Sequence, residues 1–285
     1  MTTITEKAYA KVNLTLDVLV RRDDGYHDLQ SVMQSISLCD NLTMTLGTGK
    51  AWTLRCREPG VPCDSRNLVW KAAEVFFDAA GLDPDGLDIE LEKTIPSQAG
   101  LGGGSADAAA VLRALNRHYG NMYTPEELAD LGARVGSDVP FCVLNGTAMA
   151  EGRGERLRKL KNLVDCWFVV VKPDFPVSTP VLFKKLDSQE IFRRPDNAAM
   201  EDAIDREDLR GICNLLCNVF EPAVAQDHPE IQQIKTMLME AGAWGCQMSG
   251  SGSACFGIAP TEEAARAVQE ALMKIYPRTY LARSI

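Results

Sequence analysis

The feature that most restricts the fold of this sequence is a glycine-rich segment between an expected strand and an expected helix. The segment Pro96–Ser105 reads PSQAGLGGGS. Alternating Leu87, Ile89 and Leu91 precede it, and an alanine-rich helix from about Ala106 to Tyr119 follows, with Ser105 and Asp107 as expected caps. Glycines admit positive φ and a close approach of backbone to a ligand, and a helix start presents N–H groups and the positive end of its dipole. The segment therefore predicts an anion site suited to a nucleotide phosphate.

The alternative interpretation of this segment is a flexible loop that binds nothing. The segment is not a Walker A motif, because no Gly-Lys-Ser/Thr follows the glycines. It also differs from the dinucleotide fingerprint, since the glycine spacing is different and no βαβ unit with a ribose-binding carboxylate is evident.

Hydrophobic patterning along the rest of the chain predicts an α+β fold with a boundary near 155–165. A strand is expected from Ala8 to Val18, and its alternation places Lys11 and Asn13 on one polar face. Thr124 and Pro125 form a helix start. The other expected helices are 67–80, 178–186, 199–225, 229–241 and 261–276, and further expected strands are 146–152, 166–171 and 280–283.

Composition excludes some classes of protein. The 285 residues include 46% apolar and 24% charged residues, and the net charge is −9. A dedicated nucleic-acid binder is disfavoured, because phosphate neutralisation needs clustered Lys and Arg. Nine cysteines occur without Cys-x-x-Cys or a zinc-like histidine spacing, which suits a reducing cytosol. The opening residues lack an apolar signal segment and no apolar run approaches about 18 residues, so we expect a cytoplasmic protein.

Each polar candidate outside the glycine segment also has a purely structural interpretation. Lys11 is then a surface lysine, and Asp138, in the turn Gly136–Phe141, is a helix N-cap. Tyr26 and His27 form a loop aromatic pair, and the glycine-serine segment Ser249–Ser253 is a hairpin connection.

Taken together, these segments resemble the ordered motifs of the GHMP kinase superfamily. The resemblance rests on AYAKVNL (8–14), PSQAGLGGGSA (96–106) and GCQMSGSGS (245–253). Within the superfamily, GYHDL (25–29), GSDVPF (136–141) and EGRGE (151–155) resemble the kinases that act on 4-diphosphocytidyl-2-C-methyl-D-erythritol. The similarity extends from about Lys7 to Ala282.

The resemblance implies a two-domain α+β fold with the active site in a cleft. The N-terminal domain (1–160) would be ribosomal-protein-like and would carry the phosphate loop, and the C-terminal domain (161–285) would be an α/β sandwich. The implied activity is ATP- and Mg²⁺-dependent phosphorylation of the C2 hydroxyl of 4-diphosphocytidyl-2-C-methyl-D-erythritol, a step of the non-mevalonate isoprenoid pathway. The implied partner is this small molecule, with no nucleic acid and no membrane.

The resemblance also implies roles for individual residues. Lys11 and Asp138 match the catalytic pair, in which Asp138 accepts the hydroxyl proton and Lys11 orients Asp138 and offsets phosphoryl charge. ATP-binding residues would be Pro96, Ser97, Gln98, Ala99, Gly100, Leu101, Gly102, Gly103, Gly104, Ser105 and Ala106, with Lys93, Asn67 and Leu68 nearby. Substrate-binding residues would be Asn13, Tyr26, His27, Thr179 and Phe183, with the cytosine between Tyr26 and Phe183 and its edge hydrogen-bonded by His27. Gly250, Ser251 and Gly252 would support the phosphate loop, and Ser105 would contact the metal.

Two other functions remain open from the sequence. One is a kinase for a different acceptor, such as mevalonate or homoserine, although these acceptors carry no base for Tyr26, His27 and Phe183 to hold. The other is a non-catalytic RNA-binding module, which the charge of −9 disfavours.

Overall fold

The computed structural model describes residues 1–82 and 84–285. The chain forms two compact units that are not consecutive in sequence. Unit 1 comprises residues 1–10, 39–97 and 102–145, and unit 2 comprises residues 11–38, 98–101 and 146–285. The strands β1 (Thr2–Asn13) and β3 (His27–Leu46) each contribute residues to both units.

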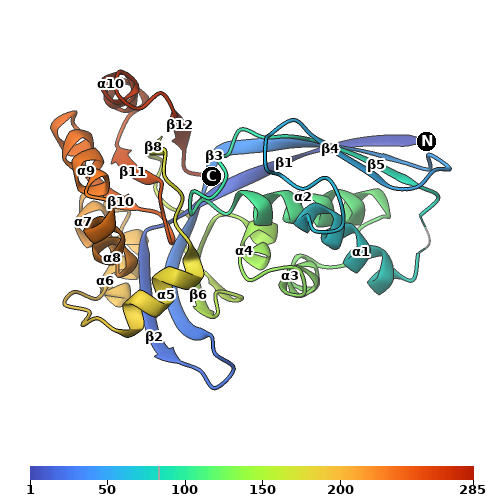
Figure 1. Ribbon diagram of the computed structural model, residues 1–285, viewed down its shortest axis with the longest axis horizontal. Coiled ribbons are helices and arrows are strands. Elements are labelled where there is room, and N and C mark those ends of the chain that lie inside the picture. Colours follow the sequence, from blue (N-terminus) through green and yellow to red (C-terminus); the bar gives the residue numbers. More distant parts are fainter. Residues whose placement is uncertain (83) are drawn as a thin grey trace. The chain divides into compact units, whose positions relative to one another are not determined.

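Unit 1 is a sheet with helices packed on one side of it (Figure 1). β4 (Thr53–Cys56) runs parallel to β5 (Leu87–Glu92), and β5 pairs antiparallel with residues 41–46 of β3. The helices are α1 (Leu68–Ala80), α2 (Gly103–His118), α3 (Pro125–Ala133) and α4 (Val139–Leu144). Met44 and Ile89 from the sheet and Phe76, Leu112 and Phe141 from the helices are buried, so this unit has its own core.

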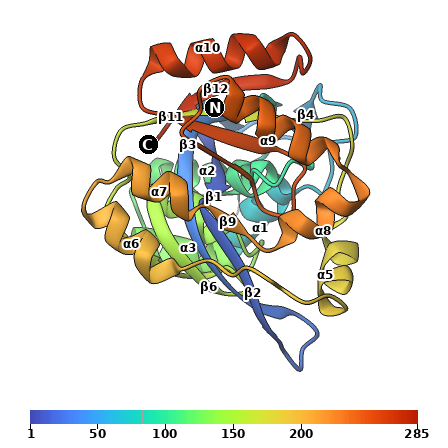
Figure 2. The same ribbon diagram turned by 90° about the vertical axis from the view of Figure 1, so that its left-hand side faces the viewer.

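Unit 2 contains a four-stranded antiparallel sheet in the order β10-β11-β8-β12. Helices α9 and α10 pack against this sheet (Figure 2). Its strands are β8 (Trp167–Val171), β10 (Gly245–Met248), β11 (Cys255–Ala259) and β12 (Thr279–Arg283). Its helices are α5 (Thr179–Asp187), α6 (Asn197–Asp205), α7 (Leu209–Leu215), α8 (Phe220–Asp227), α9 (Glu230–Glu240) and α10 (Glu262–Met273).

The remaining strands of unit 2 surround the first part of β3. β2 (Thr15–Arg21) pairs antiparallel with β3 and parallel with the two-residue strand β9 (Cys217–Asn218). β6 (Thr147–Gly152) pairs antiparallel with β3 and with β7 (Arg156–Lys159). This arrangement brings residues near 15, 30, 150 and 217 into one region of unit 2.

The starts of α1 and α3 agree with the starts expected from the sequence. Asn67 caps α1, and its Oδ1 accepts a hydrogen bond from the Val69 amide at 3.0 Å. Thr124 caps α3 in a reciprocal capping box with Glu127. Such caps depend on residues within one turn, so they can be recognised from sequence.

Three sequence-based expectations were wrong in detail. α2 begins at Gly103, and Gly102 rather than Ser105 or Asp107 is its N-cap, without a side-chain capping bond. The expected strand 8–18 is two strands that are interrupted at Leu14. The sequence pattern did not reveal this break, because the alternation of side chains continues through it. The expected helix 199–225 is three helices and a short strand, since Glu207 has a φ of +59° and Asp208 caps a new helix.

Within the described residues, no helix is both long and apolar enough to cross a lipid bilayer. All nine cysteines lie in that described part of the chain, and all of them are free thiols.

Candidate active site

The glycine-rich segment connects the end of β5 to the start of α2. Gly100 and Gly102 have φ values of +75° and +69°. The first amides of α2 have no acceptor within the helix, and no acidic side chain occupies its first turn. The left-handed glycines and the open helix start that the sequence predicts are therefore both present, and their role in binding a phosphate stays a prediction.

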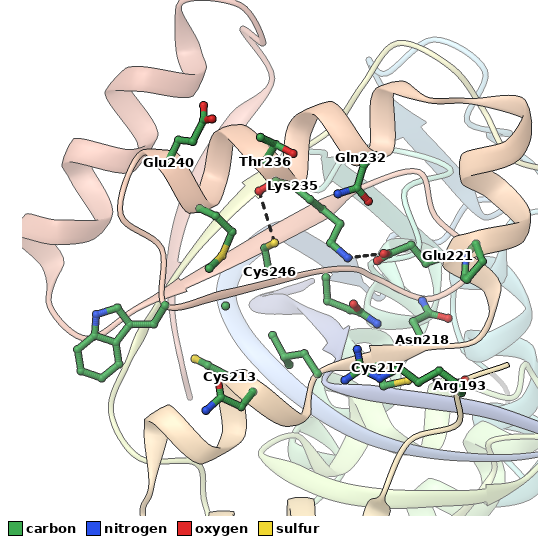
Figure 3. A pocket seen from close by; sticks show the side chains of 17 residues that line it. Arg193, Cys213, Cys217, Asn218, Glu221, Gln232, Lys235, Thr236, Glu240 and Cys246 are labelled. Atoms are coloured by element: carbon green, nitrogen blue, oxygen red, sulfur yellow. Dashed lines mark hydrogen bonds and ion pairs between the residues drawn. The ribbon is translucent and has the colours of Figure 1, made fainter.

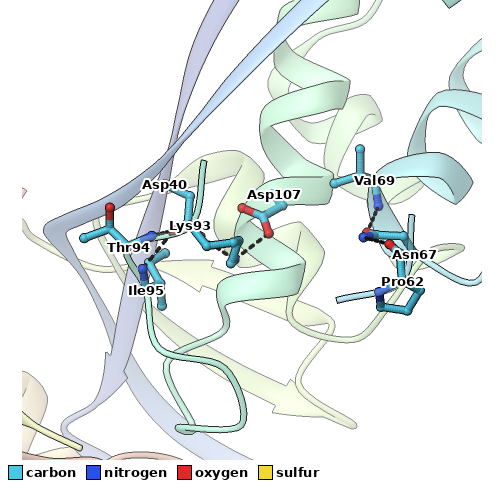
Figure 4. A network of polar contacts seen from close by, with 8 residues as sticks. All are labelled: Asp40, Pro62, Asn67, Val69, Lys93, Thr94, Ile95 and Asp107. Atoms are coloured by element: carbon cyan, nitrogen blue, oxygen red, sulfur yellow. Dashed lines mark hydrogen bonds and ion pairs between the residues drawn. The ribbon is translucent and has the colours of Figure 1, made fainter. Parts of the chain in front are cut away.

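Lys93 lies just before this segment and holds two carboxylates together (Figure 4). Its Nζ donates to Asp40 and, at 2.6 Å, to Asp107 Oδ2. Asp40 Oδ1 also accepts the backbone amides of Thr94 at 2.5 Å and Ile95 at 2.8 Å. All three charged side chains are buried. Lys93 thus ties β3, α2 and the approach to the glycine segment into one polar cluster, and its place near the nucleotide stays a prediction.

One cation shared by two buried carboxylates leaves a carboxylate without full compensation. Asp40 accepts two backbone amides, whereas Asp107 Oδ1 has no hydrogen-bond partner. Burial, only partly offset by Lys93, raises the pKa of Asp107 to about 8. Asp107 is therefore the member of the cluster that takes up a proton.

Asn67 is the N-cap of α1, and Leu68 is its first residue. Asn67 Nδ2 donates to the Pro62 carbonyl at 2.7 Å while its Oδ1 caps the helix, so both ends of this amide are engaged. A side chain added at Gly104 would lie 3.6 Å from Leu68 Cδ1. The nucleotide-binding role of both residues stays a prediction.

Unit 2 brings the two glycine segments of the sequence together. Ser249 Oγ donates to the Gly100 carbonyl at 2.9 Å, and the Ala254 amide donates to the Ala99 carbonyl at 3.1 Å. A Cβ at Gly100 would lie 2.0 Å from the Ser249 carbonyl oxygen, so only glycine allows this approach. The segment Gly250–Gly252 therefore belongs to a loop that contacts the predicted phosphate loop directly.

Lys11 and Asn13 lie side by side on β1, as the strand pattern predicts. Lys11 Nζ donates to Asn13 Oδ1 at 2.8 Å, and Asn13 Nδ2 donates to Ser31 Oγ at 2.7 Å. Lys11 is only 5% exposed, so it is not the surface lysine of the structural interpretation. Its backbone amide also donates to the Leu101 carbonyl at 3.0 Å, which joins this strand to the glycine segment.

Asp138 occupies the N-cap position of α4 in unit 1. Its side chain makes no capping hydrogen bond, in contrast to the structural interpretation of an N-cap aspartate. Asp138 and Lys11 belong to different units, and their roles as a catalytic pair stay predictions.

His27 and Phe183, two of the predicted base-binding residues, stack on each other. Their ring centroids are 4.9 Å apart with an interplanar angle of 16°, and Phe220 meets Phe183 edge-on. His27 Nε2 lies 2.6 Å from Asp187 Oδ1. One ring nitrogen of His27 is thus engaged by Asp187, and the contact of His27 with a base stays a prediction.

Tyr26 and Thr179 complete the predicted substrate set. Tyr26 is 57% exposed, and the Arg153 guanidinium lies 5.2 Å from its ring centroid. Thr179 Oγ1 lies 2.8 Å from Ser251 Oγ, so this helix start contacts the second glycine segment. Both contacts lie within unit 2.

Sequence reasoning missed Asp187 as a member of this cluster. Phe183 and Asp187 are four residues apart on α5, so they share one helix face. The sequence signal that could have revealed Asp187 was therefore a carboxylate one helical turn after Phe183.

Ser105 is the predicted metal-contacting residue, and it lies in the first turn of α2 without a capping bond. Across residues 1–82 and 84–285, no group of three or more His, Cys, Asp or Glu side chains could hold a metal ion. The contact of Ser105 with a metal stays a prediction.

Comparison with known proteins identifies the family. The model of the GHMP kinases N terminal domain matches residues 67–146, and that of the GHMP kinases C terminal domain matches residues 200–278. A protein of Exiguobacterium sibiricum named 4-diphosphocytidyl-2-C-methyl-D-erythritol kinase is 44% identical over 99% of this chain and 98% of its own length.

Solved structures agree with this assignment. A crystal structure of 4-(cytidine 5'-diphospho)-2C-methyl-D-erythritol kinase is 34% identical, covers 99% of both chains and has a TM-score of 0.83. A homoserine kinase from Cytophaga hutchinsonii shares the fold, with a TM-score of 0.77, 19% identity and coverage of 99% and 94%. The chain therefore belongs to the GHMP kinase family and, within it, to the 4-diphosphocytidyl-2-C-methyl-D-erythritol kinases.

Proposed function

We propose that the protein transfers the γ-phosphoryl group of ATP to the C2 hydroxyl of 4-diphosphocytidyl-2-C-methyl-D-erythritol. ATP is the donor expected of a kinase of this family, and the relative from Exiguobacterium sibiricum carries that acceptor in its name. The observation that carries the proposal is local to unit 2. There, the Ala99–Leu101 backbone is hydrogen-bonded both to the second glycine segment and to the strand that bears Lys11.

Phosphoryl transfer depends on positioning and on charge neutralisation rather than on covalent help from the protein. In the proposed mechanism, amides of the Pro96–Ala106 segment hold the β-phosphate, and the open start of α2 favours the negative charge. Asp138 accepts the proton of the attacking hydroxyl. Lys11, oriented by Asn13, offsets the charge on the transferred group. These roles require Asp138 to reach the attacking hydroxyl and Lys11 to reach the phosphoryl group that is transferred.

The start of α2 also fits Mg²⁺ through the chemistry of its donors. Mg²⁺ prefers oxygen ligands and keeps waters and substrate phosphates in its coordination sphere, so it needs no cluster of protein carboxylates. Ser105 places a hydroxyl in the first helical turn without a capping role, and we propose that it would contact the metal. When bound, Mg²⁺ would neutralise phosphate charge.

The acceptor is proposed from the aromatic cluster of unit 2. A cytosine needs a flat apolar surface and hydrogen bonds to its edge, and the stacked His27 and Phe183 with the exposed Tyr26 ring offer both. Mevalonate and homoserine carry no base, so they would leave these rings without a ligand. Nine free thiols suit a reducing compartment, and we propose a cytoplasmic location.

The test of this function is ADP release by the purified protein. With ATP and Mg²⁺, we expect turnover with 4-diphosphocytidyl-2-C-methyl-D-erythritol and none above background with mevalonate or homoserine. CMP or CDP should inhibit by competing for the aromatic cluster. Absence of turnover with the cytidine compound would refute the proposal, and turnover with homoserine or mevalonate without CMP inhibition would favour the other acceptor.

A further inference from the structure

A buried polar network lies beneath the second glycine segment, and the mechanism above does not use it. It borders a cavity of about 580 Å³ between α7, α8, α9 and β10 (Figure 3). Asn218 on β9 is 4% exposed. Its Nδ2 donates to the carbonyls of Met248 and Gly250, both at 2.8 Å, and its Oδ1 accepts the Phe220 amide at 3.0 Å. One side chain thus holds two carbonyls at the beginning of the glycine turn.

Glu221 bonds the same end of β10 through the other backbone group of Met248, its amide. Glu221 Oε2 accepts the Met248 amide at 3.0 Å, and its Oε1 accepts the ammonium of Lys235 from α9. Both side chains of this ion pair are less than one-fifth exposed. Met248 is therefore bonded at its amide by Glu221 and at its carbonyl by Asn218, which fixes the direction in which the chain leaves β10.

The turn transmits this constraint to the predicted phosphate loop. A Cβ on Gly250, whose carbonyl Asn218 holds, would lie 2.9 Å from the Gly100 carbonyl oxygen. Ser249 Oγ donates to that same carbonyl at 2.9 Å. One residue later, the Leu101 carbonyl accepts the Lys11 amide at 3.0 Å. A displacement of residues 248–250 would therefore displace both the glycine segment and Lys11.

We propose that Asn218 and Glu221 are positioning residues for phosphoryl transfer. They act through the Ser249–Ser253 turn, which they hold against Ala99–Leu101, and they touch neither ATP nor the acceptor. This inference rests on the proposed function, since it assumes that Pro96–Ala106 holds the phosphates of ATP. Its specific consequence is that loss of Asn218 impairs the ATP side of the reaction more than the recognition of cytidine, because Asn218 holds two carbonyls of the turn and reaches the His27–Phe183 stack only indirectly, through the Phe220 amide and the Thr179–Ser251 contact.

The test compares two buried asparagines that make similar bonds in different places. Asn218→Ala removes the hydrogen bonds that hold the carbonyls of Met248 and Gly250. Asn116→Ala is the matched control, because Asn116 is 7% exposed and joins the Tyr123 carbonyl and amide, both at 2.9 Å, near the end of α2. Steady-state kinetics for ATP and for the cytidine substrate, with melting temperatures, separate positioning from stability.

For Asn218→Ala we expect kcat/KM for ATP to fall by about 100-fold, the effect of a displacement of about 1 Å in a catalytic group. KM for the cytidine substrate should change much less than kcat/KM for ATP, because Asn218 reaches the His27–Phe183 stack only indirectly. Asn116→Ala should lower the melting temperature to a similar extent and keep kcat/KM for ATP. Equal kinetic losses in both variants, or an unchanged kcat/KM in Asn218→Ala, would overturn the proposal.

Glu221→Gln provides a second test in case Asn218→Ala does not fold. The glutamine keeps an acceptor for the Met248 amide but loses the charge that holds Lys235, so we expect a smaller loss of kcat/KM for ATP, about tenfold. Thr236→Ala, on the wall of the same cavity, should leave the kinetics unchanged. An unchanged kcat/KM in Glu221→Gln would contradict the role of Glu221.

ATP binding to the wild type and to Asn218→Ala distinguishes failure of this inference from failure of the proposed function. If wild type binds ATP but does not phosphorylate the cytidine compound, the acceptor assignment is wrong, and weaker ATP binding by Asn218→Ala still supports positioning. If both proteins bind ATP equally, positioning is wrong. If wild type binds no ATP, both are wrong.

Discussion

Lys11 shows how a residue's partners define its chemistry. Its ammonium donates to Asn13, its amide is tied to Leu101, and it is buried. The alternation of the strand predicted that Lys11 and Asn13 would share a face, because such a relation depends only on residues two apart. The link to Leu101 crosses 90 residues of sequence and has no local signal.

The proposed catalytic pair leads to the first prediction. Lys11→Ala and Asp138→Asn should each lower kcat by about 10²–10⁴, the contribution expected of charge stabilisation or general base catalysis. ADP release measures this effect, and circular dichroism verifies folding. The exposed residues Lys50 and Asp130 are controls, and Lys50→Ala and Asp130→Asn should retain activity. Activity of either site variant within a few-fold of wild type would show that its role is wrong.

The second prediction concerns Asp187, which contacts His27. Asp187→Ala removes the acceptor at 2.6 Å that orients the imidazole, so KM for the cytidine substrate should rise about tenfold while KM for ATP changes little. Asp187→Asn keeps an oxygen acceptor and should have a smaller effect. Asp227→Ala breaks an exposed pair with Lys185 and serves as the control. An equal rise in KM for ATP would contradict this specificity role.

The third prediction follows from the raised pKa of Asp107. The folded-state pKa of about 8 lies above the ordinary value of 3.8, so between these pH values the folded protein holds a proton that the unfolded chain releases. This group therefore makes the free energy of unfolding decrease as the pH rises from about 4 to about 8.

Asp107→Asn replaces the protonated carboxyl with a neutral group of the same shape. Relative to wild type, this variant should become progressively more stable as the pH rises through that window. Urea unfolding at several pH values between 4 and 8 measures the difference. Parallel stability curves for the two proteins would show that the pKa of Asp107 is not raised.

Some helices begin at a capping residue close by in the sequence, and their starts could be predicted. Elements whose ends depend on pairing with distant strands could not be predicted. The starts of α1 and α3 follow from Asn67 and Thr124, each within one helical turn. The continuous helix expected over 199–225 is instead divided around Cys217 and Asn218, which pair with β2 about 200 residues earlier. Pairing of that kind overrides a local helical pattern.

The contact between the two glycine segments leads to the fourth prediction. Gly100→Ala places a Cβ 2.0 Å from the Ser249 carbonyl at a φ of +75°, so the loops must separate and kcat/KM for ATP should fall at least 100-fold. Gly120→Ala is the matched control, because Gly120 has a φ of +83° but nothing within 4 Å of the added atom. It should cost about 1–2 kcal/mol in stability and leave the kinetics intact. Similar kinetics in both variants would contradict the role of the loop contact.

At the scale of the whole molecule, the two units are assembled from alternating parts of the chain. The chain passes from one unit to the other after residues 10, 38, 97, 101 and 145, so neither unit is a single sequence segment. The division at residue 160, which the family resemblance implies, stays a prediction. Composition along the chain cannot reveal such exchanges, because a strand that serves two units has no compositional boundary.

The net charge supports a fifth prediction at this scale. A chain with 39 acidic and 30 basic residues should show no RNA affinity that depends on salt, because such affinity arises from the release of counterions by clustered cations. Filter binding between 50 and 200 mM salt, the range over which about 10³–10⁵ in affinity is lost by a true phosphate binder, tests this expectation. An RNA affinity that falls steeply with rising salt would support the RNA-binding alternative.

The motif residues, the starts of α1 and α3 and the polar face of β1 could be recognised in the sequence because each depends on neighbours within a few positions. The partners of those residues could not. Asp187 meets His27 across 160 residues, Asp40 meets Lys93 across 53, and Ser249 meets Gly100 across 149. Such pairs depend on the tertiary fold. A hydrogen bond between residues far apart in the sequence produces no periodic pattern from which it could be predicted.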